Sequence, residues 1–475
     1  MSKKKNQSKN SASKSPSDAS LQTLKLIFAL QMGLVAVQLI RITVADSGAL
    51  RANGYNPRLE ETEARFIRGS LLDSRGKVLA CTQTEEGEEK RIYPYGEACA
   101  HVTGYIGLGK TGMEKAANSW LLQPAGLGET LKQWVSQEKI LGCDAVLTLD
   151  AELQQYIYEQ LKGYKGAVVV SEPATGKILA LVSSPSYDPE TLVQNWDQIR
   201  EDPDSPLYAR ATQGLYPPGS TFKIVTALSL YRTAEDPFEY QYICKGSLQL
   251  GDTVLDCVHR KAHGTVNVRQ AFSRSCNGFF AGLGVRLGET QLRKTAASLH
   301  LEEPFAFELP QSTCSVLPEG EISEALLGES AIGQGQTLMT PFQMNMLTAA
   351  IANQGTLYNP YLLDRVQDKN GKTVKKFLPE WYGQLMTAEE AAYLEELMGE
   401  VTASGTAQAL SDERWQVWGK TGTAQVGGGD DHSWFTGYAK KGSGRSIAVT
   451  VLIENGGTKM QAVPLTRKIL EYYMK

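Results

Sequence analysis

Residues 216–231 constrain the fold more than any other stretch of this 475-residue chain. Tyr216-Pro-Pro-Gly219 is a rigid turn that cannot continue a preceding helix. The residues after it, Ser220-Thr-Phe-Lys-Ile-Val-Thr-Ala-Leu-Ser-Leu-Tyr231, predict a helix that is apolar on nearly every face apart from Lys223. A helix of this kind is usually buried on all sides. We therefore expect it in the middle of a domain.

Ser220 and Lys223 are a candidate nucleophile and base. We expect Ser220 at or near the helix N-terminus, where backbone N–H groups and the helix dipole favour negative charge. Lys223 follows one turn later on the same side. Burial lowers the pKa of a lysine, so Lys223 can take the serine proton near neutral pH. Four other Ser-x-x-Lys matches stand in polar or turn-like sequence, where we attribute them to chance.

The string Ser275-Cys-Asn277 is a candidate polar bridge. Ser275 and Asn277 are two residues apart, so both can point into one cleft from a loop or an extended turn. Ser275 would pass a proton between Lys223 and a leaving amine, and Asn277 would hold Lys223 and a substrate amide. By itself the string is equally typical of a turn between helices. We expect Cys276 to be a small packed side chain.

Residues 417–426, rich in Thr, Val and Trp, predict a β-strand. As an edge strand it would bind an extended peptide through main-chain hydrogen bonds. Lys420, Thr421 and Thr423 would grip a terminal carboxylate, and Gly422 lets another backbone approach closely. The backbone N–H groups of Thr423 and Ser220 would form an oxyanion hole. A second Lys-Thr-Gly string, at residues 110–112, precedes a helical pattern and is read as a structural turn.

Together these strings resemble those of the class B (monofunctional) penicillin-binding proteins, which are D,D-transpeptidases of peptidoglycan synthesis. The likeness covers most of the chain after its N-terminal apolar run. Further strings that resemble the family are Arg68-Gly69, Asp73–Ala80, Val146–Asp150 with Leu153-Gln154, Val168–Val182, Pro185–Pro189, Gly333–Gln336, Thr340-Pro341 and His432–Tyr438. The resemblance implies catalytic roles for Ser220, Lys223, Ser275, Asn277 and Lys420, and substrate-binding roles for Thr421, Gly422 and Thr423.

The resemblance also implies an α/β (α+β) fold. We expect a penicillin-binding or serine β-lactamase-like transpeptidase domain, with an antiparallel sheet flanked by helices, plus an N-terminal membrane anchor and an elongated pedestal domain. No C-terminal accessory domain is expected. The expected parts are a cytoplasmic tail at 1–23, a transmembrane anchor at 24–44, a dimerisation-like pedestal at 45–145 and the transpeptidase domain at 146–475.

The expected anchor contains the uncharged run 26–40, bracketed by Lys25 and Arg41. The run is short for a span of ~20 residues, but both basic flanks can snorkel to the membrane surface. Lysines before it predict a single-pass protein with a cytoplasmic N-terminus and an extracellular or periplasmic catalytic domain. The alternatives are a cleaved signal peptide, for which no convincing cleavage site follows, and an amphipathic surface helix.

The function implied is cross-linking of peptidoglycan stem peptides through a serine acyl-enzyme formed on D-Ala-D-Ala and inhibited by β-lactams. Expected partners are stem peptides, β-lactam antibiotics, the membrane and a polytopic membrane glycosyltransferase, because nothing in the chain resembles a glycosyltransferase domain. The alternatives are a β-lactam sensor, a β-lactamase, a D,D-carboxypeptidase and a non-catalytic wall-synthesis scaffold. A sensor would need an output domain, and a β-lactamase would need a deacylating base that we could not assign to any string.

The net charge of −4 does not suggest nucleic-acid binding. The five histidines show no metal-ligand spacing, so we expect no cofactor and no metal. Of the seven cysteines, Cys244 and Cys257 flank a segment that predicts a strand, a Gly-Asp turn and a second strand. They would therefore lie close together, either as a disulfide or as two packed thiols.

Overall fold

The computed structural model describes residues 18–40, 63–124, 139–318, 320–426, 429–442, 444–457 and 461–475. The chain divides into two compact units, Met1–Ala64 and Arg65–Lys475. In the first unit, the described structure is mainly helix α1 (Asp18–Ile40), whose stretch Leu21–Leu39 is long and apolar enough to cross a membrane. The structure thus confirms a helix over the apolar run. Residues 1–17 of the expected tail and 41–44 of the expected anchor lie outside the described residues.

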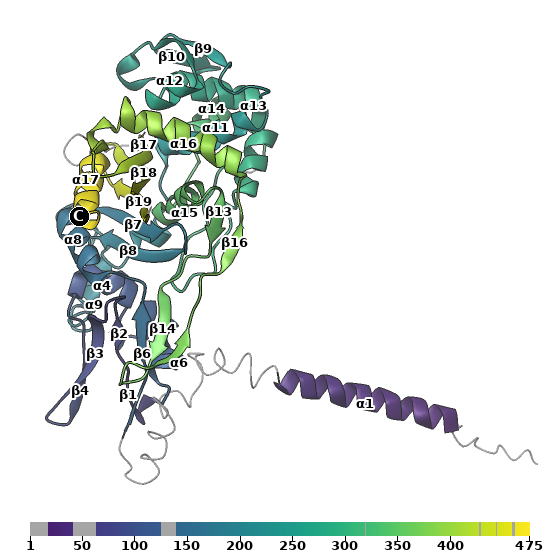
Figure 1. Cartoon of the computed structure of the whole chain (residues 1–475), viewed down its shortest axis with the longest axis vertical. Helices are drawn as coiled ribbons and strands as arrows, with labels where there is room; N and C mark the ends of the chain where they lie inside the picture. Colours follow the sequence, from purple (N-terminus) through teal and green to yellow (C-terminus); the bar gives the residue numbers. More distant parts are fainter. Residues whose placement is uncertain are drawn as a thin grey trace, which may run out of the picture. The chain divides into compact units, whose positions relative to one another are not determined.

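A five-stranded antiparallel sheet forms the middle of the second unit (Figure 1). Its strand order is β17-β18-β19-β7-β8, so β17 is an edge strand, as the sequence predicted. The hairpin β7–β8 is formed by the run 166–184, which resembled the first hairpin of the family. The bounds are β17 Gln416–Ala424, β18 His432–Lys441, β19 Arg445–Ile453, β7 Gly166–Glu172 and β8 Lys177–Ser184.

Helices cover both faces of this sheet, as expected. Helices α8 (Ala151–Leu161) and α17 (Ala462–Tyr473) pack on each other and on the sheet. Helix α15 (Pro341–Ala352), buried along almost its whole length, packs on β7, β18 and β19. The Thr340 side chain caps its first turn, and Pro341 stands at a position where no N–H is needed. Helix α16 (Ala388–Ala403) lies along β17.

The predicted central helix is α11 (Lys223–Tyr231), in which every residue but Tyr231 is buried. It packs against α13 (Asn277–Ser298) and α16. Against α13 lies a small β-lobe, which we define as residues 241–267, made of two antiparallel strand pairs. Strand β9 (Gln241–Cys244) pairs with β12 (Gly264–Asn267), and β10 (Ser247–Leu250) pairs with β11 (Thr253–Asp256). The remaining helices here are α12 (Val268–Ser273) and α14 (Glu324–Ala331).

A six-stranded sheet occupies the opposite end of this unit from the β-lobe (Figure 1). Its order is β15-β14-β6-β2-β3-β4, so residues 363–376 complete a sheet that otherwise uses residues 71–147. All its pairs are antiparallel except β2–β6. The bounds are β15 Thr373–Lys376, β14 Leu363–Gln367, β6 Asp144–Leu147, β2 Leu71–Leu72, β3 Val78–Glu85 and β4 Glu88–Ile92.

Shorter elements fill the space around these layers. Strands β1 and β5 form a parallel pair, and β13 pairs with β16. Their bounds, with those of the short helices, are β1 Phe66–Ile67, β5 Ile140–Leu141, β13 Thr356–Tyr358, β16 Trp381–Gln384, α4 Gly96–Thr103, α5 Gly112–Ala116, α6 Asn118–Leu121, α9 Trp196–Glu201, α10 Arg210–Gln213 and the 3₁₀ turns η2 Gly219–Phe222, η3 Val258–Arg260 and η4 Gln408–Leu410.

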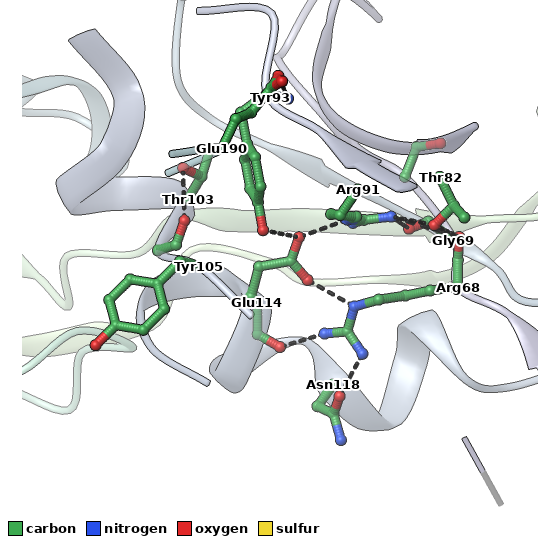
Figure 2. Close-up of polar contacts among 12 residues, drawn as sticks. Arg68, Gly69, Thr82, Arg91, Tyr93, Thr103, Tyr105, Glu114, Asn118 and Glu190 are labelled. Atoms are coloured by element: carbon green, nitrogen blue, oxygen red, sulfur yellow. Dashed lines mark hydrogen bonds and ion pairs between the residues drawn. The ribbon is translucent and has the colours of Figure 1, made fainter. Parts of the chain in front are cut away.

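The Arg68-Gly69 string takes part in a buried ion cluster around Glu114 (Figure 2). Arg68 Nε lies 2.6 Å from one carboxylate oxygen of Glu114, and Arg91 Nε lies 2.7 Å from the other. Asn118 accepts a further bond from Arg68, and the Gly69 carbonyl accepts one from Arg91. One carboxylate therefore joins the β1–β2 connection, β4 and α5.

Candidate active site

The nucleophile turn, residues 217–220, leads directly into α11. Ser220 lies in the 3₁₀ turn η2, and Lys223 is the first residue of α11. Because a 3₁₀ turn has three residues per turn, side chains at positions i and i+3 stand on the same side. The local geometry therefore places Ser220 and Lys223 side by side at a helix start, as predicted. Ser220 is half-buried, and the structure shows no hydrogen bond of its hydroxyl among the described residues.

Three contacts hold this turn against β17, β18 and the loop at Gly333. The indole N–H of Trp434 donates to the Pro217 carbonyl at 3.0 Å, and the Gly219 N–H donates to the Gly333 carbonyl at 2.7 Å. Gly219 has a φ of 54°, and a Cβ atom there would lie 2.6 Å from the Thr423 carbonyl oxygen. Only glycine allows this approach, so the turn carrying Ser220 is pressed against the edge strand.

Lys223 is fully buried and has three oxygen acceptors around its ammonium nitrogen. Its Nζ lies 2.6 Å from Asn277 Oδ1, 2.9 Å from the Ser275 carbonyl and 3.3 Å from Ser275 Oγ. Burial lowers the pKa of Lys223 to about 7. A buried amine with such a pKa exchanges a proton at neutral pH, which is what a general base for a serine requires.

Ser275 lies between α12 and α13 and connects the two buried lysines. Its φ of 55° is in the left-handed region, which is uncommon for a residue other than glycine. Its Oγ is 3.0 Å from Lys420 Nζ as well as 3.3 Å from Lys223 Nζ. Asn277 Nδ2 donates to the Asp256 carbonyl at 2.8 Å, which fixes the orientation of the amide that faces Lys223. The string thus occupies the bridging position that the sequence predicted.

Lys420 comes from the middle of β17, and its side chain is completely buried. Besides Ser275 it donates to the Thr421 carbonyl at 3.0 Å. Burial, together with the charge of Lys223, lowers the pKa of Lys420 well below its ordinary value. Neither lysine forms an ion pair with a carboxylate of the described part of the chain. Both amines therefore lack an acidic partner, which an anionic substrate group can supply on binding.

Strand β17 also carries the three expected substrate-binding residues, which differ in their exposure to solvent. Thr421 is half-buried, and its hydroxyl shares a hydrogen bond with that of Thr406. Gly422 is buried, and a Cβ atom there would lie 2.9 Å from the Pro218 carbonyl. Thr423 is exposed and next to Gly219. The structure thus brings the third string to the nucleophile turn, although the three strings are far apart in the sequence.

Several contributors were not identified from the sequence. Trp434 holds the nucleophile turn, Thr406 contacts Thr421, and the carbonyl of Asp256 orients Asn277. Only Trp434 had a signal, because it lies in the string at 432–438. The string at 110–112 leads into helix α5, so its reading as a structural turn is confirmed.

Comparison with known proteins gives consistent results. A family model described as "Penicillin binding protein transpeptidase domain" matches residues 166–471. Peptidoglycan D,D-transpeptidase PbpA of Mycolicibacterium smegmatis is 31% identical over 475 residues, covering 93% of this chain and 95% of the relative. Peptidoglycan D,D-transpeptidase MrdA of Acinetobacter baumannii is 30% identical, covering 82% of this chain and 66% of the relative.

Solved structures agree with this similarity. The penicillin G acyl-enzyme complex of penicillin-binding protein A from M. tuberculosis superimposes with a TM-score of 0.78 at 30% identity, covering 86% of this chain and 100% of that one. The D,D-transpeptidase domain of a peptidoglycan glycosyltransferase from Eggerthella lenta gives a TM-score of 0.76 at 30% identity, covering 86% of this chain and 98% of that one.

The fold and these relatives define the chain as a serine-type acyl-transferring enzyme. Within that class, the chain belongs to the penicillin-binding protein transpeptidase family, as a class B member. The expected transpeptidase fold, with its antiparallel sheet and flanking helices, is thereby confirmed.

Proposed function

We propose that this chain is a D,D-transpeptidase that cross-links peptidoglycan stem peptides through an acyl-enzyme on Ser220. The observation that carries the assignment is the position of Ser275 Oγ, between Lys223 Nζ at 3.3 Å and Lys420 Nζ at 3.0 Å. This arrangement links a base beside the nucleophile to a second, buried cation. It supports proton transfer at one end of a bound peptide and carboxylate recognition at the other.

In the first half-reaction, Ser220 Oγ attacks the carbonyl carbon between the two D-alanines and gives its proton to neutral Lys223. The backbone N–H groups of Ser220 and Thr423 stabilise the oxyanion. The terminal carboxylate is held by Thr421 and Thr423, with Lys420 supplying positive charge beneath them. The C–N bond then breaks, and the proton passes from Lys223 through Ser275 to the departing D-alanine.

In the second half-reaction, an amine of another stem peptide attacks the ester carbon. Lys223 takes the amine proton and returns it to Ser220 Oγ as the C–O bond breaks, which restores the resting enzyme. β-Lactams acylate the same serine, but the amine freed when the ring opens stays attached to the acyl group and does not depart. We therefore expect a long-lived penicilloyl-enzyme, whereas turnover within minutes would indicate a β-lactamase.

We further propose that α1 anchors the chain with its N-terminus in the cytoplasm and the catalytic domain outside. In this proposal residues 45–145 act as a pedestal whose sheet is completed by β14 and β15, and the rest of residues 146–475 forms the transpeptidase domain. A polytopic glycosyltransferase binds through the anchor and pedestal and supplies the glycan strands. The lysines that precede the apolar run 26–40 support the orientation, because positively charged residues favour the cytoplasmic side. A C-terminal reporter found in the cytoplasm would contradict it.

Labelling with a fluorescent penicillin, followed by mass spectrometry of the intact chain and its peptides, tests the assignment of the nucleophile. We expect one adduct, on Ser220, and none in Ser220→Ala. Ser74→Ala is the matched control, because Ser74 heads another Ser-x-x-Lys string but is exposed. Labelling that persists in Ser220→Ala, or that maps to Ser275, would refute the assignment.

A further inference from the structure

Three cysteines and a histidine gather beside the Ser275–Asn277 loop. They are Cys244, Cys257, His263 and Cys276, and their four potential ligand atoms all lie within 4.8 Å of one another. The cysteines are buried and the histidine is half-buried. All three cysteines are free thiols. The histidine spacing in the sequence predicted no metal site, but the fold brings cysteine and histidine side chains to one point.

The distances match those between the ligands of a tetrahedral zinc ion. Cys244 Sγ lies 3.6 Å from Cys257 Sγ and 3.5 Å from His263 Nδ1, and Cys257 Sγ lies 3.8 Å from Cys276 Sγ. With Zn–S bonds of about 2.3 Å and Zn–N bonds of about 2.0 Å, a tetrahedron separates two sulfurs by about 3.8 Å and a sulfur and a nitrogen by about 3.5 Å. The side chains therefore need little movement to enclose such an ion.

The four residues stand at the ends of separate elements. Cys244 ends β9, Cys257 follows β11, His263 precedes β12, and Cys276 caps the start of α13. Strand pairing holds Gly264 opposite Cys244, which keeps His263 beside that cysteine. A single ion at this point would join both strand pairs of the β-lobe to helix α13.

The β-lobe itself has too small a core to hold its strands firmly. Of its 27 residues only five are buried, and two of these are Cys244 and Cys257. Ile243, Val254 and Val258 are instead largely exposed. Small units that bury little apolar surface are commonly stabilised by a disulfide or a structural metal. A disulfide between Cys244 and Cys257 would account for two of the four residues, whereas a metal accounts for all four.

We propose that Cys244, Cys257, His263 and Cys276 bind one structural Zn²⁺ that positions the Ser275–Asn277 loop of the active site. Four protein ligands complete the tetrahedron, so the ion has no open position and takes no direct part in the reaction. Each cysteine loses its proton to solvent and binds as a thiolate, while the neutral imidazole binds through Nδ1.

The link to catalysis is short and rests on the proposed function. Cys276 is the residue between Ser275 and Asn277, and the carbonyl that orients Asn277 belongs to Asp256, next to Cys257. The ion would thus hold Ser275 through its neighbour Cys276, and the side-chain amide of Asn277 through Cys257 and the adjoining Asp256 carbonyl. Loss of the ion frees both strand pairs, and we expect the Lys223 acceptors at Ser275 and Asn277 to move with them.

The first experiment measures metal in the full-length protein, purified in detergent from cells grown with zinc. We expect about one Zn²⁺ per chain by plasma mass spectrometry, and release of the ion by a mercurial reagent with pyridylazoresorcinol as indicator. Replacement by Co²⁺ should give the absorption bands of a tetrahedral thiolate site. Less than a tenth of an equivalent, after purification without chelators and reloading with Zn²⁺, would overturn the proposal. A Cys244–Cys257 disulfide, seen as a loss of two mass units, would also overturn it.

Matched variants then locate the ion. Cys257→Ser and His263→Ala should each lose most of the bound zinc. Cys314→Ser and His259→Ala should retain it, because Cys314 is a buried thiol elsewhere in the core and His259 is an exposed neighbour in the β-lobe. Full zinc content in Cys257→Ser and His263→Ala would place the ion elsewhere. The metal content of the unaltered chain decides the matter even if a variant fails to fold.

Stripping the unaltered protein with a chelator tests the positioning role. We expect a lower melting temperature and penicillin acylation slowed by about a hundredfold, the loss that a shift of ~1 Å in an active group causes. Both should return with Zn²⁺. Unchanged acylation in stripped protein would refute the positioning role. Absence of acylation in the loaded protein would instead refute the proposed function, and the metal measurement would be unaffected.

Discussion

Replacing Gly219 by alanine tests whether close contact between the nucleophile turn and β17 sets the reaction geometry. A φ of 54° is unfavourable for alanine, and the left-handed conformation costs about 1–2 kcal/mol. The added Cβ atom would also lie 2.6 Å from the Thr423 carbonyl oxygen, closer than real Cβ atoms approach any atom. The turn and the strand must therefore separate, and the backbone N–H groups of Ser220 and Thr423 separate with them.

Gly251→Ala provides a control with the same backbone cost and no clash. Gly251 has a φ of 56°, and a Cβ atom there would meet nothing within 4 Å. We expect Gly251→Ala to lose about 1 kcal/mol of stability and to acylate normally. Gly219→Ala should lose more stability, and its acylation should slow by about 100-fold, since displacing one oxyanion donor costs about 10²–10³ in rate.

The assay follows acylation by a fluorescent penicillin in stopped flow, with thermal unfolding measured on the same preparations. The comparison between the two variants separates backbone strain from the contact with β17. If Gly219→Ala acylates at the same rate as Gly251→Ala, the contact does not set the geometry and the proposed oxyanion hole is wrong.

Three further predictions follow from the buried charges. Lys223→Ala should abolish penicillin acylation while its circular dichroism spectrum stays native, and near-normal acylation would mean that another base acts. Because burial lowers the pKa of Lys223 to about 7 and only its neutral form accepts a proton, the acylation rate should rise with pH through about 7 and level off above it; at pH 6 it should be about tenfold below the plateau. A profile that is flat between pH 5.5 and 8 would contradict this. Glu114→Ala leaves two buried arginines unpaired and should cost about 3–5 kcal/mol of unfolding free energy, whereas the exposed Glu152→Ala should change the melting temperature little. Equal melting temperatures for these two variants would show that the cluster is not a structural support.

The parts of the site that the sequence predicted are those governed by local rules. The Pro-Pro-Gly turn, the apolar helix and the three-residue spacing place Ser220 beside Lys223 without knowledge of the rest of the fold. The threonine-rich run 417–426 predicts a strand, and glycine at 422 predicts close approach of another backbone. These inferences hold because each depends on residues adjacent in the chain.

The parts that were not predicted depend on contacts between distant segments. The Asp256 carbonyl orients Asn277, but every residue has a carbonyl, so no side chain marks this role. Residues 363–376 join the six-stranded sheet although all four residues of β15 are exposed, so no apolar alternation indicated a partner. The cysteine and histidine cluster combines separations of 13, 6 and 13 residues, and none of these is a familiar metal-ligand spacing.

The contribution of β14 and β15 to the six-stranded sheet means that the backbone passes between the two sheets three times. It leaves through 147–151 after β6, returns through 358–363 before β14, and leaves again through 376–381 after β15. Three connecting segments resist twisting of the six-stranded sheet relative to the rest of the unit far better than a single linker does. A pull on the six-stranded sheet is therefore delivered directly to β13, β16 and the adjoining helices α15 and α16, and α16 lies along β17. Cutting the chain before β7 to isolate the catalytic part would leave β14 with an open edge, which invites pairing with other chains.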